Sequence, residues 1–204
     1  MPYLFKNAYE TSKTGIPVMK SMILEFQEDV ACNYIDRQYM LGDSLLVAPI
    51  FNDKGEASYY LPKGNWTNFL TGEKVAGGTW IKEIHDYMSI PLLARPNSII
   101  AVGNQNTKPD YDFAEGVTLH VFELEEGKKA STTIFNMKGK SELEIDITLN
   151  NKVIDINYEG VEKPFSILLR GVFNVKAVEG ASFVAEEMGT KIIPEGGHIR
   201  IVIL

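Results

Sequence analysis

Apolar and polar residues follow one another along this chain in a way that predicts a short α/β start and then many β-strands. Residues 2–13 predict a helix, because three apolar side chains recur on one face of it: Leu4, Phe5 and Ala8. Gly15 suits the position just beyond the helix end, and Pro17 blocks its continuation. Residues 18–24 form a mostly apolar run of strand length, which is typical of a parallel strand buried on both faces.

A second short helix is expected after that strand. Asp29 can cap its first turn, and the helix would reach Ile35. Helix, strand and helix in this order are the rhythm of an α/β unit rather than of a β-sandwich.

From residue 45 onward the pattern becomes all-β. Short strand-like runs alternate with turn signals made of Gly, Pro, Asn and Asp, as in a β-sandwich. The runs lie at residues 45–48, 57–61, 90–93 and 98–102. Residues 103–110 are polar and aperiodic, so we expect a linker there.

Strands resume beyond this linker and indicate a second antiparallel sandwich. In residues 142–147 apolar and acidic side chains alternate, which predicts one buried and one solvated face. Similar runs lie at residues 117–122, 153–158, 165–169, 172–178 and 199–204. The expected fold is mainly β, with two antiparallel β-sandwich domains preceded by a short α/β segment.

Composition narrows the classes of function. The chain has 204 residues, 45% of them hydrophobic, and a formal net charge of −7. The acidic balance argues against a nucleic-acid partner or an anionic membrane surface, and no apolar run is long enough to span a bilayer. One cysteine, Cys32, cannot form an intramolecular disulfide, and no signal peptide is recognisable, so we expect a cytoplasmic location.

Acidic residues near the start are the first candidates for chemistry. A retaining glycosidase needs two carboxylates about 5–5.5 Å apart. Glu25 stands out because it follows the apolar run at 18–24, and residues beyond the carboxyl end of a barrel strand line active sites. Solvated or helix-capping roles are more common for acidic residues. The whole set is Glu25, Glu28, Asp29, Asp36 and Asp43.

Other reactive side chains give weaker signals. The three histidines, His85, His120 and His198, have no partner at metal-ligand spacing. Ser44 does not lie in the Gly-x-Ser-x-Gly turn of α/β-hydrolases. Cys32 could have a lowered pKa near a helix N-terminus, although burial as a small apolar residue is the more common role.

Aromatic residues crowd the middle of the chain. Such rings could form a carbohydrate-binding platform, whereas rings of the same kind also fill a sandwich core and its edges. Trp80 lies between Thr79 and Ile81 in an expected strand, which favours packing. The members of this group are Trp66, Trp80, Tyr59, Tyr60, Phe69 and Tyr87.

Two short motifs stand out in the front of the chain. The first matching motif is Gly-Ile-Pro-Val-Met-Lys at residues 15–20, followed by Glu25 and Phe26. The second is Asp-Arg-Gln-Tyr-Met-Leu-Gly-Asp-Ser-Leu-Leu-Val-Ala-Pro-Ile at residues 36–50. In this order the two motifs resemble the end of the catalytic barrel in glycoside hydrolase family 31. Each motif is short, but their order along the chain is specific to this family.

Later motifs resemble the sandwich domains of the same family. Tyr-Leu-Pro-Lys-Gly-Asn-Trp at 60–66 and Ile-Pro-Leu-Leu-Ala-Arg at 90–95 are similar to its proximal C-terminal sandwich. Lys-Pro-Asp-Tyr at 108–111, with residues 117–122, is most similar to the distal sandwich of the bacterial α-xylosidase branch.

The resemblance implies a three-part organisation and a reaction. It places the incomplete end of a (β/α)8 barrel at residues 1–44, a proximal sandwich at 45–103 and a distal sandwich at 104–204. Family members hydrolyse α-linked sugars with retention and without a cofactor, using two aspartates on barrel strands that precede the matched region. No catalytic, cofactor-binding or metal-binding residue is therefore assigned to this chain, and Asp36 and Asp43 match framework positions.

These implications define an expected role and a rival one. We expect the chain to be the C-terminal accessory region of an α-xylosidase or α-glucosidase and to be inactive alone. Its expected partner is the missing barrel part of the enzyme. It could also assemble as a homo-oligomer. The rival is a carbohydrate-binding or oligomer-assembly module, with an exposed aromatic stripe around Trp66 and Trp80. Residues 1–30 should be mobile, or packed against the sandwich or another copy.

Overall fold

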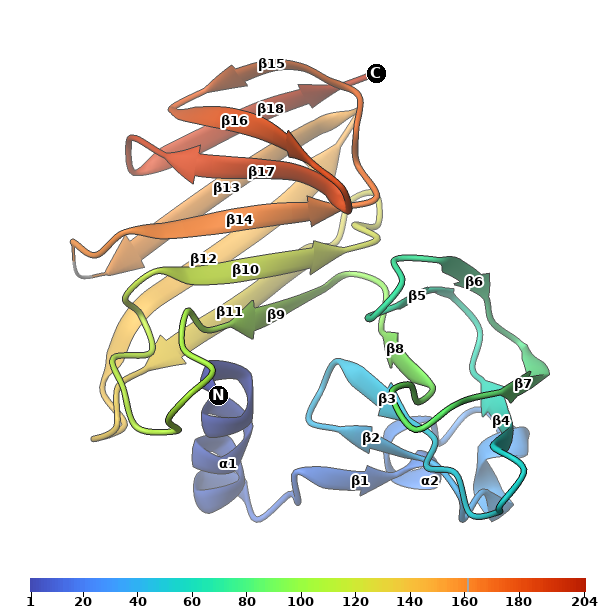
Figure 1. Cartoon of the computed structure of the whole chain (residues 1–204). Helices are drawn as coiled ribbons and strands as arrows, with labels where there is room; N and C mark the ends of the chain where they lie inside the picture. The colour runs from blue at the N-terminus through green and yellow to red at the C-terminus, as the bar shows by residue number, and fades with distance from the viewer. Residues whose placement is uncertain (161) are drawn as a thin grey trace. The chain divides into compact units, whose positions relative to one another are not determined.

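The chain folds into two compact units that are rich in β-strands (Figure 1). The computed structural model describes residues 1–160 and 162–204. One unit, here called the proximal unit, is Glu10–Pro96. The other, the distal unit, combines Met1–Tyr9 with Asn97–Leu204, so it is assembled from two separate stretches of the chain.

Three short helices lie near the start of the chain. They are α1 (Pro2–Thr14), α2 (Met22–Glu25) and the 3₁₀-helix η1 (Val30–Tyr34). Gly15 follows α1 with a φ of +77°, as predicted for the residue beyond a helix end. The Asp29 carboxylate accepts a hydrogen bond from the Ala31 N–H (3.1 Å), which confirms the predicted cap. No helix in the described residues is long and apolar enough to cross a membrane.

The buried face of α1 differs from the one that apolar spacing predicts. Leu4 is 40% exposed and Ala8 is also exposed, whereas Tyr3 and Asn7 are buried. Of the three predicted residues, Phe5 alone packs against the core of the distal unit. Asn7 can be buried because its Nδ2 donates to the Tyr3 carbonyl oxygen (2.7 Å) within the helix.

Residues 18–24 do not form the expected parallel strand. Strand β1 covers only Met19–Ser21 and pairs antiparallel with β2 (Tyr39–Leu41), and α2 begins at the next residue. Met22 is fully buried in the proximal core, but three apolar neighbours stay 44–59% exposed: Met19, Ile23 and Leu24. The run contains one anchor and several surface residues, and continuous apolarity alone does not distinguish this from two-sided burial.

The proximal unit contains two antiparallel sheets. Six strands form one sheet in the order β1-β2-β3-β8-β5-β6, and β4 pairs with β7 in the other. Their bounds are β3 Leu45–Val47, β4 Glu56–Leu61, β5 Asn65–Asn68, β6 Lys74–Ala76, β7 Thr79–Ile84 and β8 Leu92–Ala94. Met22 from α2 and Cys32 from η1 join the core with Tyr59, Trp66 and Leu93, so the front segment packs against the sandwich.

The sequence at residues 60–66 folds around a buried indole. Trp66 is 1% exposed, and its Nε1 donates to the Pro62 carbonyl oxygen (2.8 Å). The Gly77 N–H donates to the Gly64 carbonyl oxygen (2.8 Å) and brings the β6–β7 turn onto this loop. A Cβ on Gly77 would lie 1.9 Å from the Pro62 oxygen, so only glycine allows this approach.

Side-chain amides pair with two residues on the edge of β4 that does not face β7. Gln38 Nε2 donates to the Tyr60 carbonyl oxygen (2.7 Å), and Gln38 Oε1 accepts from the Tyr60 N–H (2.7 Å). Asn52 pairs with Glu56 in the same way. Asn52 Nδ2 donates to the Glu56 carbonyl oxygen (2.6 Å), and Asn52 Oδ1 accepts from the Glu56 N–H (3.0 Å). Each amide replaces one residue of a neighbouring strand, because outward N–H and C=O groups need partners.

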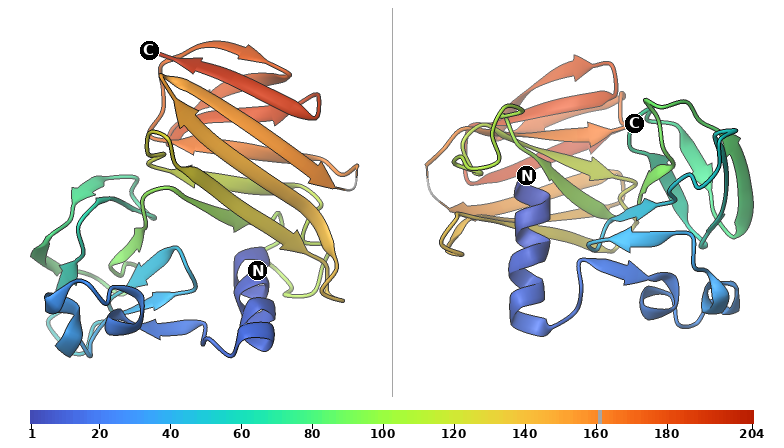
Figure 2. Two further views of the ribbon diagram at one scale, coloured as in Figure 1. Left: turned by 180° about the vertical axis from the view of Figure 1, so that it is seen from behind. Right: turned by 60° about the horizontal axis from the view of Figure 1, so that its bottom comes forward.

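The distal unit is a sandwich of two five-stranded sheets (Figure 2). Their orders are β16-β17-β14-β10-β9 and β11-β12-β13-β18-β15. The strand bounds are β9 Ser98–Val102, β10 Val117–Phe122, β11 Lys129–Phe135, β12 Ser141–Asn150, β13 Val153–Gly160, β14 Phe165–Arg170, β15 Val175–Glu179, β16 Ala181–Glu186, β17 Gly189–Pro194 and β18 His198–Ile203. Leu143, Ile145 and Ile147 of β12 enter the shared core, which confirms the alternation predicted for residues 142–147.

Two features of the distal unit differ from the sequence prediction. Strands β10 and β14 pair in parallel, although a purely antiparallel sandwich is expected. Strand β9 pairs with β10, so the expected linker at 103–110 lies within the distal unit, and the change of unit falls at Pro96 and Asn97. The structure groups the chain into two units, and the three-part division at residues 44 and 103 stays a prediction.

The amide of Gln38 is expected to contribute measurably to stability. Gln38→Ala should lower the free energy of unfolding by about 1–3 kcal/mol, because it leaves the N–H and C=O of Tyr60 without partners on that edge. Gln27→Ala is the matched control, since the exposed Gln27 amide reaches only the Leu24 carbonyl oxygen at 3.4 Å. Urea unfolding of both variants measures the difference, and equal losses would contradict the assignment.

Candidate functional site

Four charged side chains from separate segments of the proximal unit converge. Lys20 lies on β1, Glu25 ends α2, Asp43 lies in the turn between β2 and β3, and Arg95 directly follows β8. Strands β1, β2, β3 and β8 are consecutive in their sheet, so the ladder brings these positions together. We call Lys20, Glu25, Asp43 and Arg95 the ionic cluster.

Each carboxylate of the ionic cluster contacts a cation. Lys20 Nζ lies 3.4 Å from Glu25 Oε2 and donates a hydrogen bond to Asp43 Oδ1. Arg95 Nη1 donates to Glu25 Oε1 (2.7 Å) and to the Asp43 carbonyl oxygen (3.1 Å). The side chains of Lys20, Glu25 and Arg95 are 12%, 19% and 26% exposed. The cluster is therefore balanced in charge and partly shielded from water.

Backbone hydrogen bonds and one aromatic ring hold the cluster in place. The Arg95 N–H donates to the Ser44 carbonyl oxygen (2.8 Å), and the Gly42 N–H donates to that of Val18 (2.7 Å). The Arg95 guanidinium carbon lies 4.7 Å from the centre of the Phe26 ring, a cation–π distance. Both the backbone and the side chain of Arg95 thus fasten the β2–β3 turn.

The electrostatics of Lys20 define what the cluster can do. Burial acts to lower the pKa of Lys20, but the hydrogen bond and charge of Asp43 and the charge of Glu25 outweigh it, so the pKa is raised. Lys20 stays protonated at neutral pH and cannot serve as a base. Glu25 and Asp43 share its ammonium group instead of flanking an open sugar site. The arrangement fastens segments together and does not form an acid/base pair.

The other acidic candidates have separate roles. Glu28 and Asp36 are exposed. Asp29 caps η1, and its Oδ2 accepts a hydrogen bond from the Tyr60 hydroxyl (2.9 Å). The structure therefore brings two of the five predicted carboxylates together and leaves three in the solvated or capping roles that are usual for acidic residues.

Burial keeps the Cys32 thiol and the His120 imidazole in their neutral forms at neutral pH. Cys32 is buried, and burial together with a nearby carboxylate raises its pKa to about 11, so its thiol stays protonated. Burial and the charge of Arg170 lower the pKa of His120 to about 4. His198 Nε2 lies 3.6 Å from Asp155 Oδ1. Among the described residues, no three His, Cys, Asp or Glu side chains are grouped to hold a metal ion.

A hydrogen-bonded chain at the end of β7 is missing from the sequence prediction. Glu83 Oε2 accepts from the Tyr59 hydroxyl (3.1 Å) and lies 3.0 Å from His85 Nε2. His85 Nδ1 lies 3.2 Å from Ser89 Oγ. The Ser89 hydroxyl in turn donates to Asp86 Oδ1 (2.9 Å), so it is engaged in closing its own turn. The signal in the sequence was the spacing of histidine, aspartate and serine within one short loop.

The aromatic group divides into buried and exposed members. Trp66, Tyr59 and Tyr60 are 1–8% exposed, whereas Trp80 is 57% exposed and Tyr87 is fully exposed. The rings of Tyr60 and Trp80 lie 5.7 Å apart between centroids. The packing role predicted for these rings holds for the first three, and a surface stripe that combines Trp66 with Trp80 does not form.

Removing one cation should expose the coupling within the ionic cluster. Arg95→Met is expected to lower the free energy of unfolding by about 1–3 kcal/mol, because a partly buried carboxylate loses its charged partner. Adding Glu25→Gln should recover part of this loss. Urea unfolding of the single and double variants gives the coupling energy, with the exposed Arg37→Met as control. Simple additivity would contradict a direct interaction.

His120 should make stability depend on pH. Its pKa is about 4 in the folded chain against 6.5 ordinarily, so the unfolded chain binds the proton first as the pH falls. The stability gained from neutral His120 is therefore lost as the pH drops from about 6.5 towards 4. His120→Gln should flatten the measured unfolding free energy across this window. Gln27→Ala, which changes an exposed side chain that does not titrate, should leave the slope unchanged.

Comparison with known proteins places these features in a family. The family model described as glycosyl hydrolase family 31 C-terminal domain matches residues 15–100, and the C-terminal domain of alpha-xylosidase YicI matches residues 112–204. Alpha-xylosidase XylQ of Lactiplantibacillus pentosus is 36% identical over 165 residues, which cover 79% of this chain and 22% of that relative. An alpha-xylosidase of Emericella nidulans is 34% identical over 128 residues, covering 59% of this chain and 16% of the relative. The chain spans about a fifth of the length of these relatives.

Solved structures share the fold over the length of the chain. The cycloalternan-forming enzyme from Listeria monocytogenes gives a TM-score of 0.84 at 20% identity, covering 99% of this chain and 22% of that one. The alpha-xylosidase from Xanthomonas citri gives 0.72 at 21% identity, covering 100% of this chain and 23% of that one. The two family models together match residues 15–100 and 112–204, which are most of this chain. The chain therefore belongs to glycosyl hydrolase family 31 and carries the C-terminal domains of that family.

Proposed function

We propose that this chain is the C-terminal accessory region of a retaining α-glycosidase that hydrolyses terminal α-linked xylose or glucose. In this proposal it braces a catalytic (β/α)8 barrel, which supplies both catalytic aspartates, and has no glycosidase activity alone. The distal family model and the two relatives named alpha-xylosidase favour xylose.

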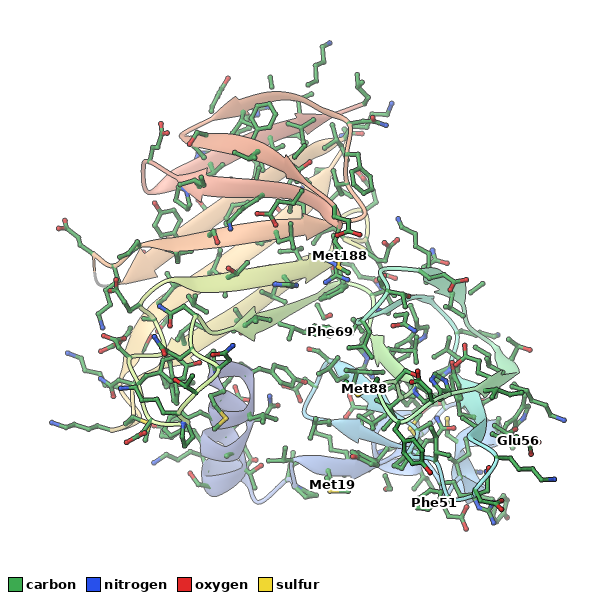
Figure 3. The ribbon with its side chains drawn as sticks, viewed as in Figure 1. Met19, Phe51, Glu56, Phe69, Met88 and Met188 are labelled. Atoms are coloured by element: carbon green, nitrogen blue, oxygen red, sulfur yellow. The ribbon has the colours of Figure 1, made fainter. Side chains whose placement is uncertain are left out.

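The observation that carries the proposal is the exposed apolar surface of residues 16–34. Met22 and Cys32 anchor this segment in the proximal core at 0% exposure. Around them, six large apolar side chains stay 44–92% exposed: Ile16, Met19, Ile23, Leu24, Val30 and Tyr34. Figure 3 labels Met19 on β1. Exposed apolar residues gathered in this way mark a surface for protein contact, and the barrel is the partner we assign to it.

The position of β1 supports the same partner. It is the outermost strand of its sheet, and the edge away from β2 has no neighbour among the described strands. An open edge can be extended by a further strand. The resemblance assigns residues 15–20 to the end of the barrel, so β1 is the segment through which barrel and sandwich would join.

The ionic cluster gives this junction rigidity. Lys20 is on β1 itself, and its partners Glu25 and Asp43 come from α2 and the β2–β3 turn. Arg95 adds the end of β8 to the same group. A barrel strand continuing from β1 would therefore be fixed to the proximal sheet by side chains as well as by the strand ladder.

The proposal predicts that activity requires the catalytic barrel. The purified chain should not hydrolyse p-nitrophenyl α-xyloside. When it is expressed with the barrel part of XylQ lacking its own matching C-terminal residues, the two polypeptides should co-purify. Met19→Asp combined with Leu24→Asp should weaken that association at least tenfold, because charge would enter an apolar contact.

Phe173→Asp is the control for this experiment, since Phe173 is 58% exposed on the distal unit. It should leave the association unchanged. Turnover by the chain alone, or association that ignores the double substitution, would count against an accessory role through residues 16–34.

A further inference from the structure

A pocket of about 670 Å³ lies beside the edge of β4 that faces away from β7. On this edge the amides of Gln38 and Asn52 pair with Tyr60 and Glu56. Its volume is within the range of small-molecule sites. The lining includes Ala48 and Ala57, whose small side chains leave the space open. Figure 3 labels Phe51 and Glu56 in the segment that leads into β4. The side chains used in the argument below are Arg37, Phe51, Glu56, Ser58, Lys82 and Ile84.

Ser58 presents backbone groups to this pocket. In an antiparallel pair, residues two apart direct their N–H and C=O to the same edge. Gln38 and Asn52 engage Tyr60 and Glu56 on the edge away from β7, so Ser58 directs its N–H and C=O to that edge as well. Within the described residues neither group of Ser58 has a partner there.

The width of this gap restricts what can fill it. The two capped residues, Glu56 and Tyr60, are roughly 13 Å apart along the strand, with one open residue between them. An added peptide strand pairs over several residues, and the amides of Gln38 and Asn52 block it on both sides. Two vicinal hydroxyl groups fit a single-residue gap, one donating to the Ser58 carbonyl oxygen and the other accepting from its N–H.

The charges around the pocket favour a neutral ligand. Arg37 and Lys82 provide two positive charges, and Glu56 and Glu83 provide two negative ones. A phosphate or an acidic peptide would require an excess of cations. A lining with both charged donors and charged acceptors instead suits a ligand rich in hydroxyl groups, each of which can both donate and accept.

Two exposed aromatic rings complete the chemistry. Phe51 lines the pocket and is 68% exposed. Trp80, at 57% exposed, lies on the same face of β7 as Lys82 and Ile84, because side chains two residues apart share a face. Phe51 offers a flat apolar surface in the pocket, and Trp80 offers another two residues along β7 from the lining residue Lys82. The C–H face of a sugar ring can pack on such surfaces.

We propose that this pocket is an accessory binding site for a neutral saccharide. The open N–H and C=O of Ser58 hold a vicinal diol, Arg37, Lys82 and Glu56 bind further hydroxyl groups, and Phe51 and Trp80 pack against the ring. Testing this site with maltotriose, an α-linked oligosaccharide, and with xylose rests on the proposed function. The site would retain a glycan chain on the proximal unit.

The test is a titration of the purified 204-residue chain with maltotriose and with xylose, followed by backbone and indole NMR signals. Saturable shifts are expected at the Ser58 amide and the Trp80 indole. The Trp66 indole should not move, because it is 1% exposed and bonded to Pro62. Titration calorimetry then measures the affinity of each variant.

Ser58→Pro removes the open N–H on an edge where no β4–β7 ladder bond is lost. Ser58→Pro and Phe51→Ala should each weaken binding at least tenfold. Tyr87→Ala, which removes an exposed ring outside the pocket, should leave affinity unchanged. If Ser58→Pro fails to fold, Phe51→Ala and Lys82→Met decide.

Three results would overturn the proposal. The first is no saturable response to either sugar, and the second is a response that both Ser58→Pro and Phe51→Ala leave intact. The third is a shift of the Ser58 amide signal that an extended peptide of alternating Thr and Val causes but neither sugar does. Because binding is read on the chain without a barrel, its failure leaves the accessory role standing. Failure of the accessory role is read separately, by turnover and co-purification.

Discussion

Strand β4 must satisfy its backbone with a neighbour on one side only, and much of the proximal unit follows from how it does so. An N–H or C=O in a partly buried strand costs stability when it lacks a partner. Gln38 and Asn52 supply those partners from segments before the strand. Fixing these two amides fixes the backbone around them, which places Arg37 and Phe51. It also holds the inward side of β4, where Tyr59 and Leu61 enter the core.

The local half of the fold could be predicted from the sequence, because strand alternation and helix ends depend on neighbouring residues. Leu143, Ile145 and Ile147 follow their predicted pattern, and Asp29 caps the predicted helix. The buried face of α1 could not be predicted in this way. Its packing is decided by the distal core, which takes Phe5 and leaves Leu4 in solvent. The exposed neighbours of Met22 illustrate the same limit, since an apolar run does not reveal which of its side chains the fold buries.

The ionic cluster and the β4 edge share a second reason for escaping prediction. Arg95 and Glu25 are 70 residues apart in sequence, and Gln38 and Tyr60 are 22 apart. No periodicity links such positions, so sequence reasoning found Glu25 and Asp43 as candidate acids without their shared cation. The order of strands in the sheet explains why the family motifs at residues 15–26, 36–50 and 90–95 lie near one another in the fold. They are the segments that β1, β2, β3 and β8 bring to one end of a sheet.

The proximal unit is inserted between two stretches of the distal one, and this order has a consequence for synthesis. Residues 1–9 emerge from the ribosome first, yet the rings that receive them come much later: Phe5 packs against Phe113 at 5.2 Å between centroids, and Tyr9 against Phe135 at 4.6 Å. Residues 10–96 have all emerged by then, and domains generally fold as units in the order of their synthesis. The residues of α1 that pack on the distal core therefore stay without their partners until residues 97–204 have been made and the sandwich forms.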